Sequence, residues 1–342
     1  MSRLFTNEIV FRGHPDKVCD QISDAIVDAC LSQDKGSRCG VETMGGKSAV
    51  YITGEITTRA EIDIEAIALG VLERCGYPSM PIVVDVGRQS ADIALGTNDQ
   101  VGGAGDNGMM FGFATRDTTR LLPKAMVILQ EFSRAYDELR KNDPGRFRSD
   151  GKAQITGIYD ENMWLQDIDT FTICYQNSEK DRKATDKIVK DLALSAMHKH
   201  GMKKGLRRFL INPTGRFEIG GFEGDAGMTG RKIVVDSYHG FAPVGGGAFS
   251  GKDPTKVDRS GAYMARLIAM DTLTQQSLRW CQVQLSYSIG IEEPMAIYVT
   301  SDRGHIDVDP SLFDRCKPAN IIEEMRLLEA NYERKAAFGH FE

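Results

Sequence analysis

Residues 225–263 read DAGMTGRKIVVDSYHGFAPVGGGAFSGKDPTKVDRSGAY, and the rest of the chain is organised around this stretch. Its glycines allow the backbone to approach a ligand and to point N–H groups at phosphate oxygens. Lys and Arg side chains among them would form charge-assisted hydrogen bonds, each worth roughly 1.5–3 kcal/mol. Aspartates would repel phosphate unless a divalent cation lay between the two. The stretch therefore predicts a site for Mg²⁺ and a polyphosphate.

Two segments resemble known phosphate-binding motifs, but a key residue or the flanking secondary structure does not fit. Residues 246–253 read GGAFSGKD, but Asp253 stands where a P-loop needs Ser or Thr to bind Mg²⁺. Residues 103–108 read GAGDNG, yet no hydrophobic strand precedes them and no helix follows, which excludes a Rossmann fingerprint. On composition alone, a mobile glycine-rich surface loop with solvated charges stays open as the alternative.

The composition is that of an ordinary globular protein. The 342 residues suffice for two or three subdomains. A net charge of -6 argues against nucleic-acid binding, which needs a basic face. Because the sequence has neither a signal-peptide segment nor an apolar run that could span a bilayer, we expect a cytoplasmic protein without a membrane partner. The seven scattered cysteines contain no C-x-x-C and predict reduced, mostly buried thiols.

Hydrophobic periodicity predicts helices and strands in three rough rounds without strict alternation, which favours an α+β fold. Helices are expected at 15–31, 121–139, 188–197, 260–273 and 321–335. Strands are expected at 48–58, 81–86, 154–160, 167–176, 207–211, 281–290 and 294–300. Residues 89–108 are predicted to form a long loop, and Asp150 and Lys152 to lie on a turn.

Four aspartates recur at every fourth position of the first predicted helix: Asp16, Asp20, Asp24 and Asp28. Such a stripe usually faces solvent. We therefore expect this aspartate stripe to be solvated. Only Asp16, which lies beside His14 and Lys17 at the junction of loop and helix, is expected to do more.

Six motifs in one order carry a resemblance to a known family. They are FRGHPDKVCDQISDAIVDA (11–29), GEITT (54–58), GAGDNGMMFGFAT (103–115), INPTGRFEIGG (211–221), GDAGMTGRK (224–232) and GGGAFSGKDPTKVDRSGAY (245–263). Over nearly its whole length the sequence resembles the S-adenosylmethionine synthetases, also called methionine adenosyltransferases. This favours the phosphate site over the mobile surface loop.

The resemblance implies three similar, intertwined α+β domains. They would be an N-terminal domain (1–12 with 116–220), a central domain (13–115 with 221–259) and a C-terminal domain (260–342). It also implies a homodimer, possibly a dimer of dimers, with active sites at the subunit interface.

The same resemblance implies ATP and L-methionine as substrates, with K⁺ and two Mg²⁺ per site. In that family the methionine sulfur attacks the 5′ carbon of ATP. The displaced triphosphate is then hydrolysed to phosphate and pyrophosphate. A thioether has no proton to lose, so no general base is needed, and in-line positioning could supply roughly 7–11 kcal/mol of the barrier.

Roles carry over to this sequence motif by motif. The expected catalytic residues are His14, Lys152, Arg231, Lys232, Lys252 and Lys256. The expected ATP-binding residues are His14, Asp150, Lys152, Phe217, Asp225, Arg231, Lys232, Ala248, Lys252 and Ile289. Methionine would be bound by Glu55, Gln89, Asp225 and Lys256. Asp16 and Asp258 resemble the Mg²⁺ ligands, and Glu42 and Ser250 the K⁺ ligands.

Several assignments have a structural alternative. For His14 it is a buried core histidine, which the flanking glycine and proline on a loop disfavour. Phe217 and Ile289 could be core residues, Glu42 and Glu55 ordinary acids on a strand face, and Asp150 a turn residue.

The sequence also departs from the family pattern. Phe11 and Arg12 replace the usual Ser-Glu before GHPDK, which reverses a charge beside His14 and could either tighten phosphate binding or disturb the histidine. The 89–108 loop is shorter than usual, and the chain ends at GHFE, before an expected aromatic and acidic tail. Four further residues differ from the usual ones: Asn107, Ser149, Ala226 and His239.

Two other functions therefore stay open. One is a catalytically impaired homologue that serves as a nucleotide-binding or regulatory subunit, and the other is a polyphosphatase that has lost the transfer step.

Overall fold

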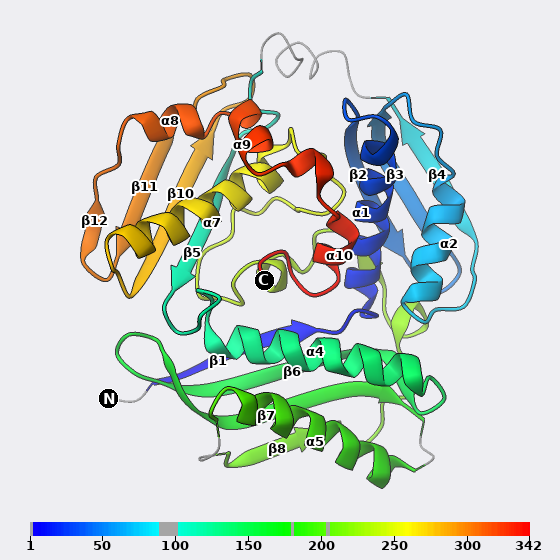
Figure 1. The fold of residues 1–342 in the computed structure, drawn as a ribbon. Helices are drawn as coiled ribbons and strands as arrows, with labels where there is room; N and C mark the ends of the chain where they lie inside the picture. Colours follow the sequence, from blue (N-terminus) through cyan, green and yellow to red (C-terminus); the bar gives the residue numbers. More distant parts are fainter. Residues whose placement is uncertain (1–2, 89–101, 179–180, 203–205) are drawn as a thin grey trace.

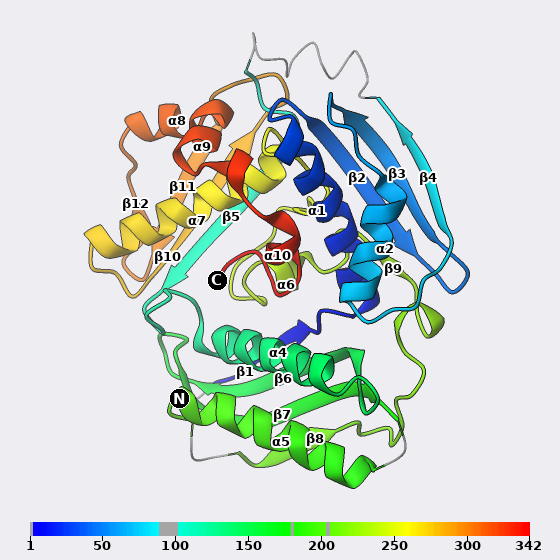
Figure 2. The same ribbon diagram turned by 45° about the vertical axis from the view of Figure 1, so that its right-hand side comes forward.

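Three four-stranded sheets surround a common centre in the computed structural model, which describes residues 3–88, 102–178, 181–202 and 206–342 (Figure 1). The first sheet has the order β1-β6-β7-β8, the second β4-β3-β2-β9 and the third β12-β11-β10-β5. The long helices α1, α4 and α7 lie on the inner side of the second, first and third sheets respectively (Figures 1 and 2). The predicted α+β fold with three similar units is confirmed.

The first sheet is formed mainly by the middle of the chain. Its strands are β1 (Arg3–Val10), β6 (Phe147–Tyr159), β7 (Leu165–Asn177) and β8 (Arg208–Ile211), and its helices are α4 (Lys124–Asn142) and α5 (Arg182–Lys199). The second sheet contains β2 (Arg38–Gly45), β3 (Val50–Thr57), β4 (Ile82–Gly87) and β9 (Gly227–Met228), with α1 (Pro15–Gln33) and α2 (Ile64–Arg74).

The third sheet contains β5 (Gly108–Thr115), β10 (Trp280–Tyr287), β11 (Ala296–Ser301) and β12 (Gly304–Ile306), with α7 (Val257–Gln275), α8 (Ser311–Arg315) and α9 (Pro318–Glu324). Four short helices complete the described chain: η1 (Gly221–Glu223), α6 (Ile233–Asp236), η2 (Leu327–Glu329) and α10 (Tyr332–Ala336). The predicted division into three domains stays a proposal. Strand β5 pairs with β10, so residues 108–115 belong to the third sheet, whereas the prediction placed them in the central domain.

The order and pairing of helices and strands repeat along the chain, although the amino-acid sequence shows no repeat. The orders α1-β2-β3-α2-β4 and α4-β6-β7-α5-β8 are the same. In both, the first two strands pair antiparallel, and the strand after the second helix pairs parallel to the second of them. The third unit begins likewise with α7-β10-β11 and then adds the antiparallel hairpin strand β12.

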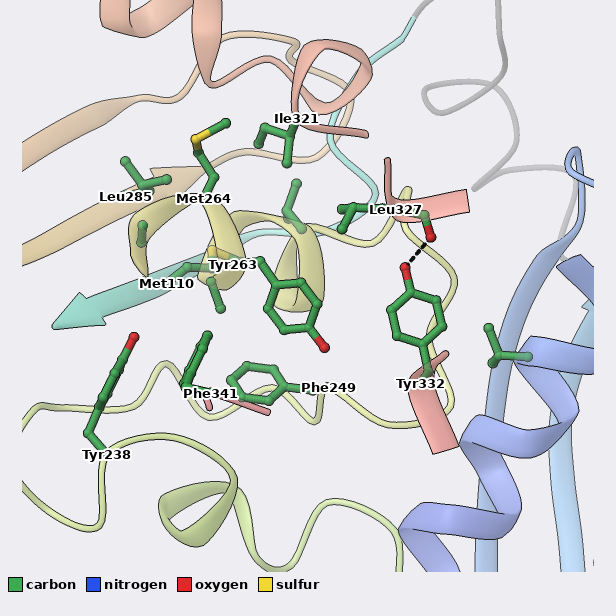
Figure 3. Close-up of a cluster of buried hydrophobic side chains, with 14 of the residues drawn as sticks. Met110, Tyr238, Phe249, Tyr263, Met264, Leu285, Ile321, Leu327, Tyr332 and Phe341 are labelled. Carbon is green, nitrogen blue, oxygen red and sulfur yellow. Dashed lines mark hydrogen bonds between the residues drawn. The ribbon is translucent and has the colours of Figure 1, made fainter. Parts of the chain in front are cut away.

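The C-terminal residues lie in the centre, between the three long helices (Figures 1 and 2). The Phe341 ring stacks on Tyr238 at 4.8 Å and meets Phe249 edge-on at 6.0 Å. Tyr332 is fully buried, and its hydroxyl donates to the carbonyl of Leu327 (Figure 3). Since burying such a side chain contributes roughly 1.5–3 kcal/mol, this cluster holds the three units together.

Helix α1 forms where predicted because its N-terminal residues and the spacing of its apolar residues both favour a helix. Pro15 occupies the first turn, and His14 caps the helix by accepting the N–H of Asp16. Val18, Ile22 and Ile26 are fully buried at helical spacing. The expectation of a solvated aspartate stripe is wrong, however, because Asp16, Asp20 and Asp24 are at most 2% exposed.

Two other local predictions are wrong. Residues 321–335 do not form one helix, because Arg326 adopts a left-handed φ of 49° and a new helix starts at Tyr332 after an Asn331 cap. Asp150 and Lys152 do not lie on a turn but within β6, which continues through a register shift between Phe147 and Gly151. The predicted 89–108 loop lies mostly outside the described residues.

All seven cysteines have free thiols, and all but Cys174 are buried. No helix within the described part of the chain is long and apolar enough to cross a bilayer.

His239 makes stability pH-dependent in a testable way. It is buried at a left-handed φ of 53°, and burial lowers its pKa from 6.5 to about 4. Its contribution is therefore complete above the unfolded-state pKa and is lost as the pH falls from 6.5 to 4. We expect His239→Gly to flatten the loss of unfolding free energy across this range by up to about 3 kcal/mol.

Chemical unfolding at several pH values measures this slope. The exposed His305, changed to Ala, is the control and should leave the slope unchanged. An equal pH dependence in wild type and His239→Gly would contradict the assignment.

Candidate active site

The aspartates of the stripe are wholly or partly buried because their carboxylates accept backbone N–H groups from three distant segments. Asp16 accepts from Met228, Asp20 from Gly230 and Asp24 from Gly251, each at 2.9 Å. Asp28 accepts from Tyr332 and Glu333, both at 2.9 Å. One face of α1 thus fixes both glycine-rich segments and the C-terminal segment.

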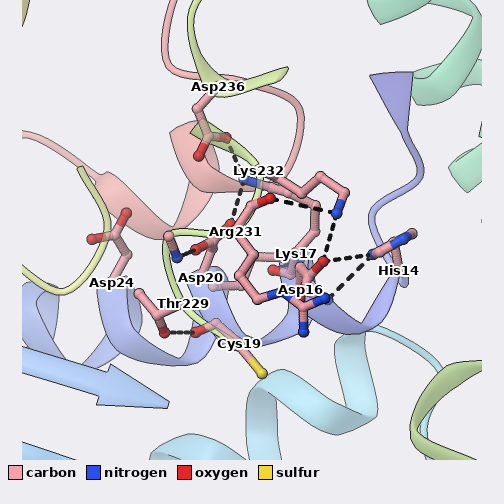
Figure 4. Close-up of polar contacts among 12 residues, drawn as sticks. His14, Asp16, Lys17, Cys19, Asp20, Asp24, Thr229, Arg231, Lys232 and Asp236 are labelled. Carbon is pink, nitrogen blue, oxygen red and sulfur yellow. Dashed lines mark hydrogen bonds and ion pairs between the residues drawn. The ribbon is translucent and has the colours of Figure 1, made fainter. Parts of the chain in front are cut away.

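Buried cations balance the buried carboxylates (Figure 4). The ammonium of Lys17 lies 3.0 Å from Asp20 and also pairs with Asp236. Burial alone would lower the pKa of Lys17, but these two carboxylates raise it, so the lysine stays charged. Removing one partner of such a pair leaves an uncompensated charge and costs about 3–5 kcal/mol.

A first group of candidate residues lies at the N-terminus of α1 (Figure 4). Asp16 pairs with Lys232 at 2.6 Å and with Arg231 at 3.6 Å. His14 accepts the Asp16 N–H at Nδ1, which leaves Nε2–H as its donor. Burial, and then the charge of Lys232, lower the pKa of His14 to about 3, so the ring is neutral at pH 7.

Asp150 and Lys152 of β6 lie near this first group, and two further candidates, Phe217 and Asp225, lie on the segments before and after η1. Asp150 is buried and accepts the N–H of Gly221 at 2.8 Å, and burial raises its pKa to about 6. Lys152 is exposed two residues further along β6, and its charge acts on both Asp150 and His14. The carbonyl of the half-buried Phe217 accepts from Asn177 at the end of β7. Asp225 is exposed, and its negative charge acts on Asp150.

A second group lies further along α1, around the cationic loop, defined here as residues 251–258. Lys252 pairs with Asp258, and Lys256 pairs with the buried Asp253 at 2.5 Å. Lys252 also forms an isolated β-bridge with Gly40 of β2. Gly40 is opposite Glu55 of β3, whose side chain lies against it.

The remaining candidates lie around this loop. Glu42 is exposed on β2, while Ser250 is buried and its hydroxyl has no hydrogen-bond partner among the residues that the structure describes. Ala248 packs against Gly230, which links the loop to the first group. The N–H of the exposed Ile289 donates to Asn107 at 2.8 Å, and Gly108 beside it faces Asp258. Gln89 lies outside the described residues.

The two groups contact α1 through Asp16 and Asp24, which are roughly 12 Å apart along a helix. Within the described residues, no three His, Cys, Asp or Glu side chains are arranged to hold a metal. Each group instead pairs lysines with a carboxylate near a glycine-rich backbone. Such an arrangement can bind a phosphate chain whose oxygens complete the coordination of a hard cation.

Sequence reasoning missed the buried charges that shape the site. Asp20, Asp24, Lys17, Asp236 and Arg259 are all at most 1% exposed and ion-paired. The four-residue spacing of the aspartates was visible. This spacing alone does not show that the aspartates are buried. Their burial could have been predicted only if their distant Lys and Arg partners were known.

Three family models match the chain. They are the N-terminal domain of S-adenosylmethionine synthetase over residues 2–99, its central domain over 101–217 and its C-terminal domain over 219–342. The chain belongs to the S-adenosylmethionine synthetase family. It is 40% identical to the S-adenosylmethionine synthase of Clostridium tetani, in an alignment that covers 100% of this chain and 94% of that protein. S-adenosylmethionine synthetases are methionine adenosyltransferases, so this family is one of enzymes.

Arg12, the departure from the synthetase pattern beside His14, faces other partners. Its Nε donates to Gln21 at 2.8 Å, and its guanidinium lies 3.6 Å from both Asp137 of α4 and Glu333 of α10. Gln21 donates back to the Arg12 carbonyl at 2.8 Å. Arg12 therefore joins three structural units through their helices.

We expect Arg12→Met to lower the free energy of unfolding by about 1–2 kcal/mol, because a half-buried charge network loses its centre. Its kcat/KM for both substrates should stay within about twofold of wild type. Arg74→Met is the matched control: Arg74 pairs with the same Glu333 at 2.9 Å but is half exposed, so its loss should cost under about 1 kcal/mol. A selective rise in the KM for ATP in Arg12→Met would show that Arg12 acts on the phosphates instead.

Proposed function

We propose that this chain makes S-adenosylmethionine from ATP and L-methionine. The observation that carries the proposal is the convergence of His14, Arg231 and Lys232 on Asp16, together with the anchored cationic loop, in a chain of this family. The sulfur of methionine attacks the 5′ carbon of ATP as the bond from that carbon to the triphosphate oxygen breaks. Both bonding electrons leave with the triphosphate, which is then hydrolysed to phosphate and pyrophosphate.

The developing charge on the leaving oxygen sets the main electrostatic demand of this reaction. His14 supports the proposal because its Nε2–H is free to donate to that oxygen, while its Nδ1 is held by Asp16 N–H. Lys152, Arg231, Lys232, Lys252 and Lys256 would bind the triphosphate. Fixed donors of this kind stabilise charge where it forms and cost little reorganisation.

The remaining roles concern recognition of the two substrates. Phe217 and Ile289 would contact adenine, Asp150 would bind the ribose hydroxyls, and Ala248 would contact ATP. Glu55, Gln89, Asp225 and Lys256 would bind methionine. Carboxylates suit this task because they can hold both the ammonium group of methionine and the sulfonium of the product.

Two Mg²⁺ and one K⁺ are part of the proposal. Asp16 and Asp258 fit Mg²⁺, since each carboxylate now has a lysine ammonium as its cationic partner and since Mg²⁺ usually needs only one or two carboxylates beside substrate phosphates. Bound Mg²⁺ would neutralise the triphosphate. Glu42 and Ser250 fit K⁺: they flank the hydrogen bond from Val41 to Gly251, and the buried Ser250 hydroxyl has no partner within the described part of the chain.

A homodimer with active sites at its interface, possibly assembled further as a dimer of dimers, is the proposed form. The resemblance to the synthetase family implies this form. The first and second groups of one chain contact α1 at points about 12 Å apart. The outer sheet faces support this assembly, since they expose Met44, Tyr51, Val83, Met109 and Tyr298.

The first test is to incubate the purified protein with ATP, L-methionine, Mg²⁺ and K⁺. We expect S-adenosylmethionine, phosphate and pyrophosphate in equal amounts, all dependent on methionine. Phosphate without S-adenosylmethionine would favour a polyphosphatase. Nucleotide binding without any product would favour the impaired regulatory subunit, which Arg12 no longer supports because its charge faces Gln21, Asp137 and Glu333.

Lys252→Ala should lose most activity, with kcat/KM falling about 100-fold or more while thermal unfolding stays near wild type, because one triphosphate contact is lost from an intact loop. The exposed Lys187→Ala on α5 is the control and should keep full activity. Wild-type turnover by Lys252→Ala would contradict the role.

Refolding Lys252→Ala together with Lys232→Ala tests the interface site. A mixed dimer has one site with both lysines intact, so up to about a quarter of wild-type activity should return if half of the dimers are mixed. No recovery, with mixed dimers present, would mean that both groups act within one chain.

A further inference from the structure

The cationic loop is anchored to α1 by a buried ion pair that the proposed reaction does not use directly. Asp24 and Arg259 are both fully buried, and the guanidinium Nη2 of Arg259 donates to Asp24 Oδ1. The same carboxylate oxygen accepts the N–H of Gly251 at 2.9 Å. Arg259 Nε donates to the carbonyl of Lys252 at 2.7 Å. The two members of the pair therefore hold the backbone on both sides of Lys252.

Gly251 allows this anchoring because of its backbone. Its φ is +83°, and its carbonyl accepts the N–H of Val41 at 2.9 Å. A Cβ at this position would lie 1.9 Å from the Val41 carbonyl oxygen, so only glycine fits. The chain before Lys252 is thus fixed on β2 as well as on α1.

The side chain of Arg259 is fixed in position by its contacts. Its Nη1 donates to the hydroxyl of Tyr263 at 3.2 Å, and its guanidinium carbon lies 4.0 Å from the centre of the Tyr332 ring. Each of its three nitrogens has a fixed partner. Arg259 also follows Asp258 directly in the first turn of α7, so the same anchor fixes the carboxylate that pairs with Lys252.

We propose that Asp24 and Arg259 are positioning residues, which hold the cationic loop so that Lys252 and Asp258 meet the triphosphate in the geometry of the transfer. This rests on the proposed function. Neither residue touches substrate. Because displacing a catalytic group by about 1 Å can cost 100-fold in rate, the anchor sets how well the triphosphate is bound and released.

A planar guanidinium is required for this role, whereas charge alone would satisfy Asp24. A lysine could pair with Asp24 but could not also reach the Lys252 carbonyl and the Tyr263 hydroxyl, because its ammonium is a single point on a flexible stem. Arg259→Lys therefore keeps the charge balance of the core and removes the fixed geometry. This separates positioning from simple neutralisation.

The test compares Arg259→Lys with Asp28→Asn in the full-length protein. Asp28 is the next member of the aspartate stripe and also accepts two backbone N–H groups, but from the C-terminal segment. For Arg259→Lys we expect a fall in kcat of about 10–100-fold. The Kd of inorganic tripolyphosphate, measured calorimetrically with Mg²⁺, should rise about tenfold, and the KM for methionine should change less than about threefold. Asp28→Asn should lower Tm and leave the tripolyphosphate Kd unchanged.

Three outcomes would overturn the proposal. One is a wild-type tripolyphosphate Kd in Arg259→Lys, and another is an equal rise of that Kd in Asp28→Asn, which would reveal general destabilisation. If Arg259→Lys does not fold, Tyr263→Phe removes one partner of Arg259 and should raise the Kd about threefold. An unchanged Kd in Tyr263→Phe is then the third.

The proposed function fails separately. If the wild-type protein makes no S-adenosylmethionine, the reaction is wrong, yet the tripolyphosphate Kd values of the variants still decide the positioning role. If wild type is active and Arg259→Lys is indistinguishable from it in kcat and Kd, only the positioning role is wrong.

Discussion

The structure depends on hydrogen bonds from distant backbone N–H groups to the buried aspartates of α1. A carboxylate is costly to bury, and each one here is compensated by a cation, by backbone donors or by both. Asp16, Asp20 and Asp24 together hold the segments around Met228, Gly230 and Gly251. The two glycine-rich segments that carry the cationic side chains are thereby fixed to one rigid helix. A site built on a helix is more precise than one built on free loops.

Much of the fold could be predicted from local sequence. The helix at 15–31 follows from the helical spacing of its apolar residues, and the strands at 281–290 and 294–300 follow from the alternating burial along them. The break within 321–335 could not be predicted in the same way. There the backbone N–H groups of Tyr332 and Glu333 bind Asp28, a partner about 300 positions earlier in the chain, and no local pattern reveals such a contact.

The site also combines features that local sequence predicts with features that only the tertiary structure reveals. Motifs indicated which residues carry the charge, and the structure brings His14, Asp16, Arg231 and Lys232 together. What motifs could not indicate is how the charges are supported. Asp24 and Arg259 lie 235 positions apart in sequence, and an aspartate at helical spacing is usually solvated. Only the tertiary pairing distinguishes a buried carboxylate from a surface one.

The central position of the C-terminal segment has a consequence for biosynthesis. Phe341, Tyr332 and His340 fill the space between the three long helices, and the His340 N–H donates to Asp236, the partner of Lys17. During translation, the helix that fixes the glycine-rich segments emerges about 300 positions before the residues that close the core around it. The nascent chain must therefore keep several buried charges solvated until residue 341 has left the ribosome. The centre therefore cannot close until this segment is available, and nascent chains that stall before this point expose a charged, incompletely packed interior to chaperones and proteases.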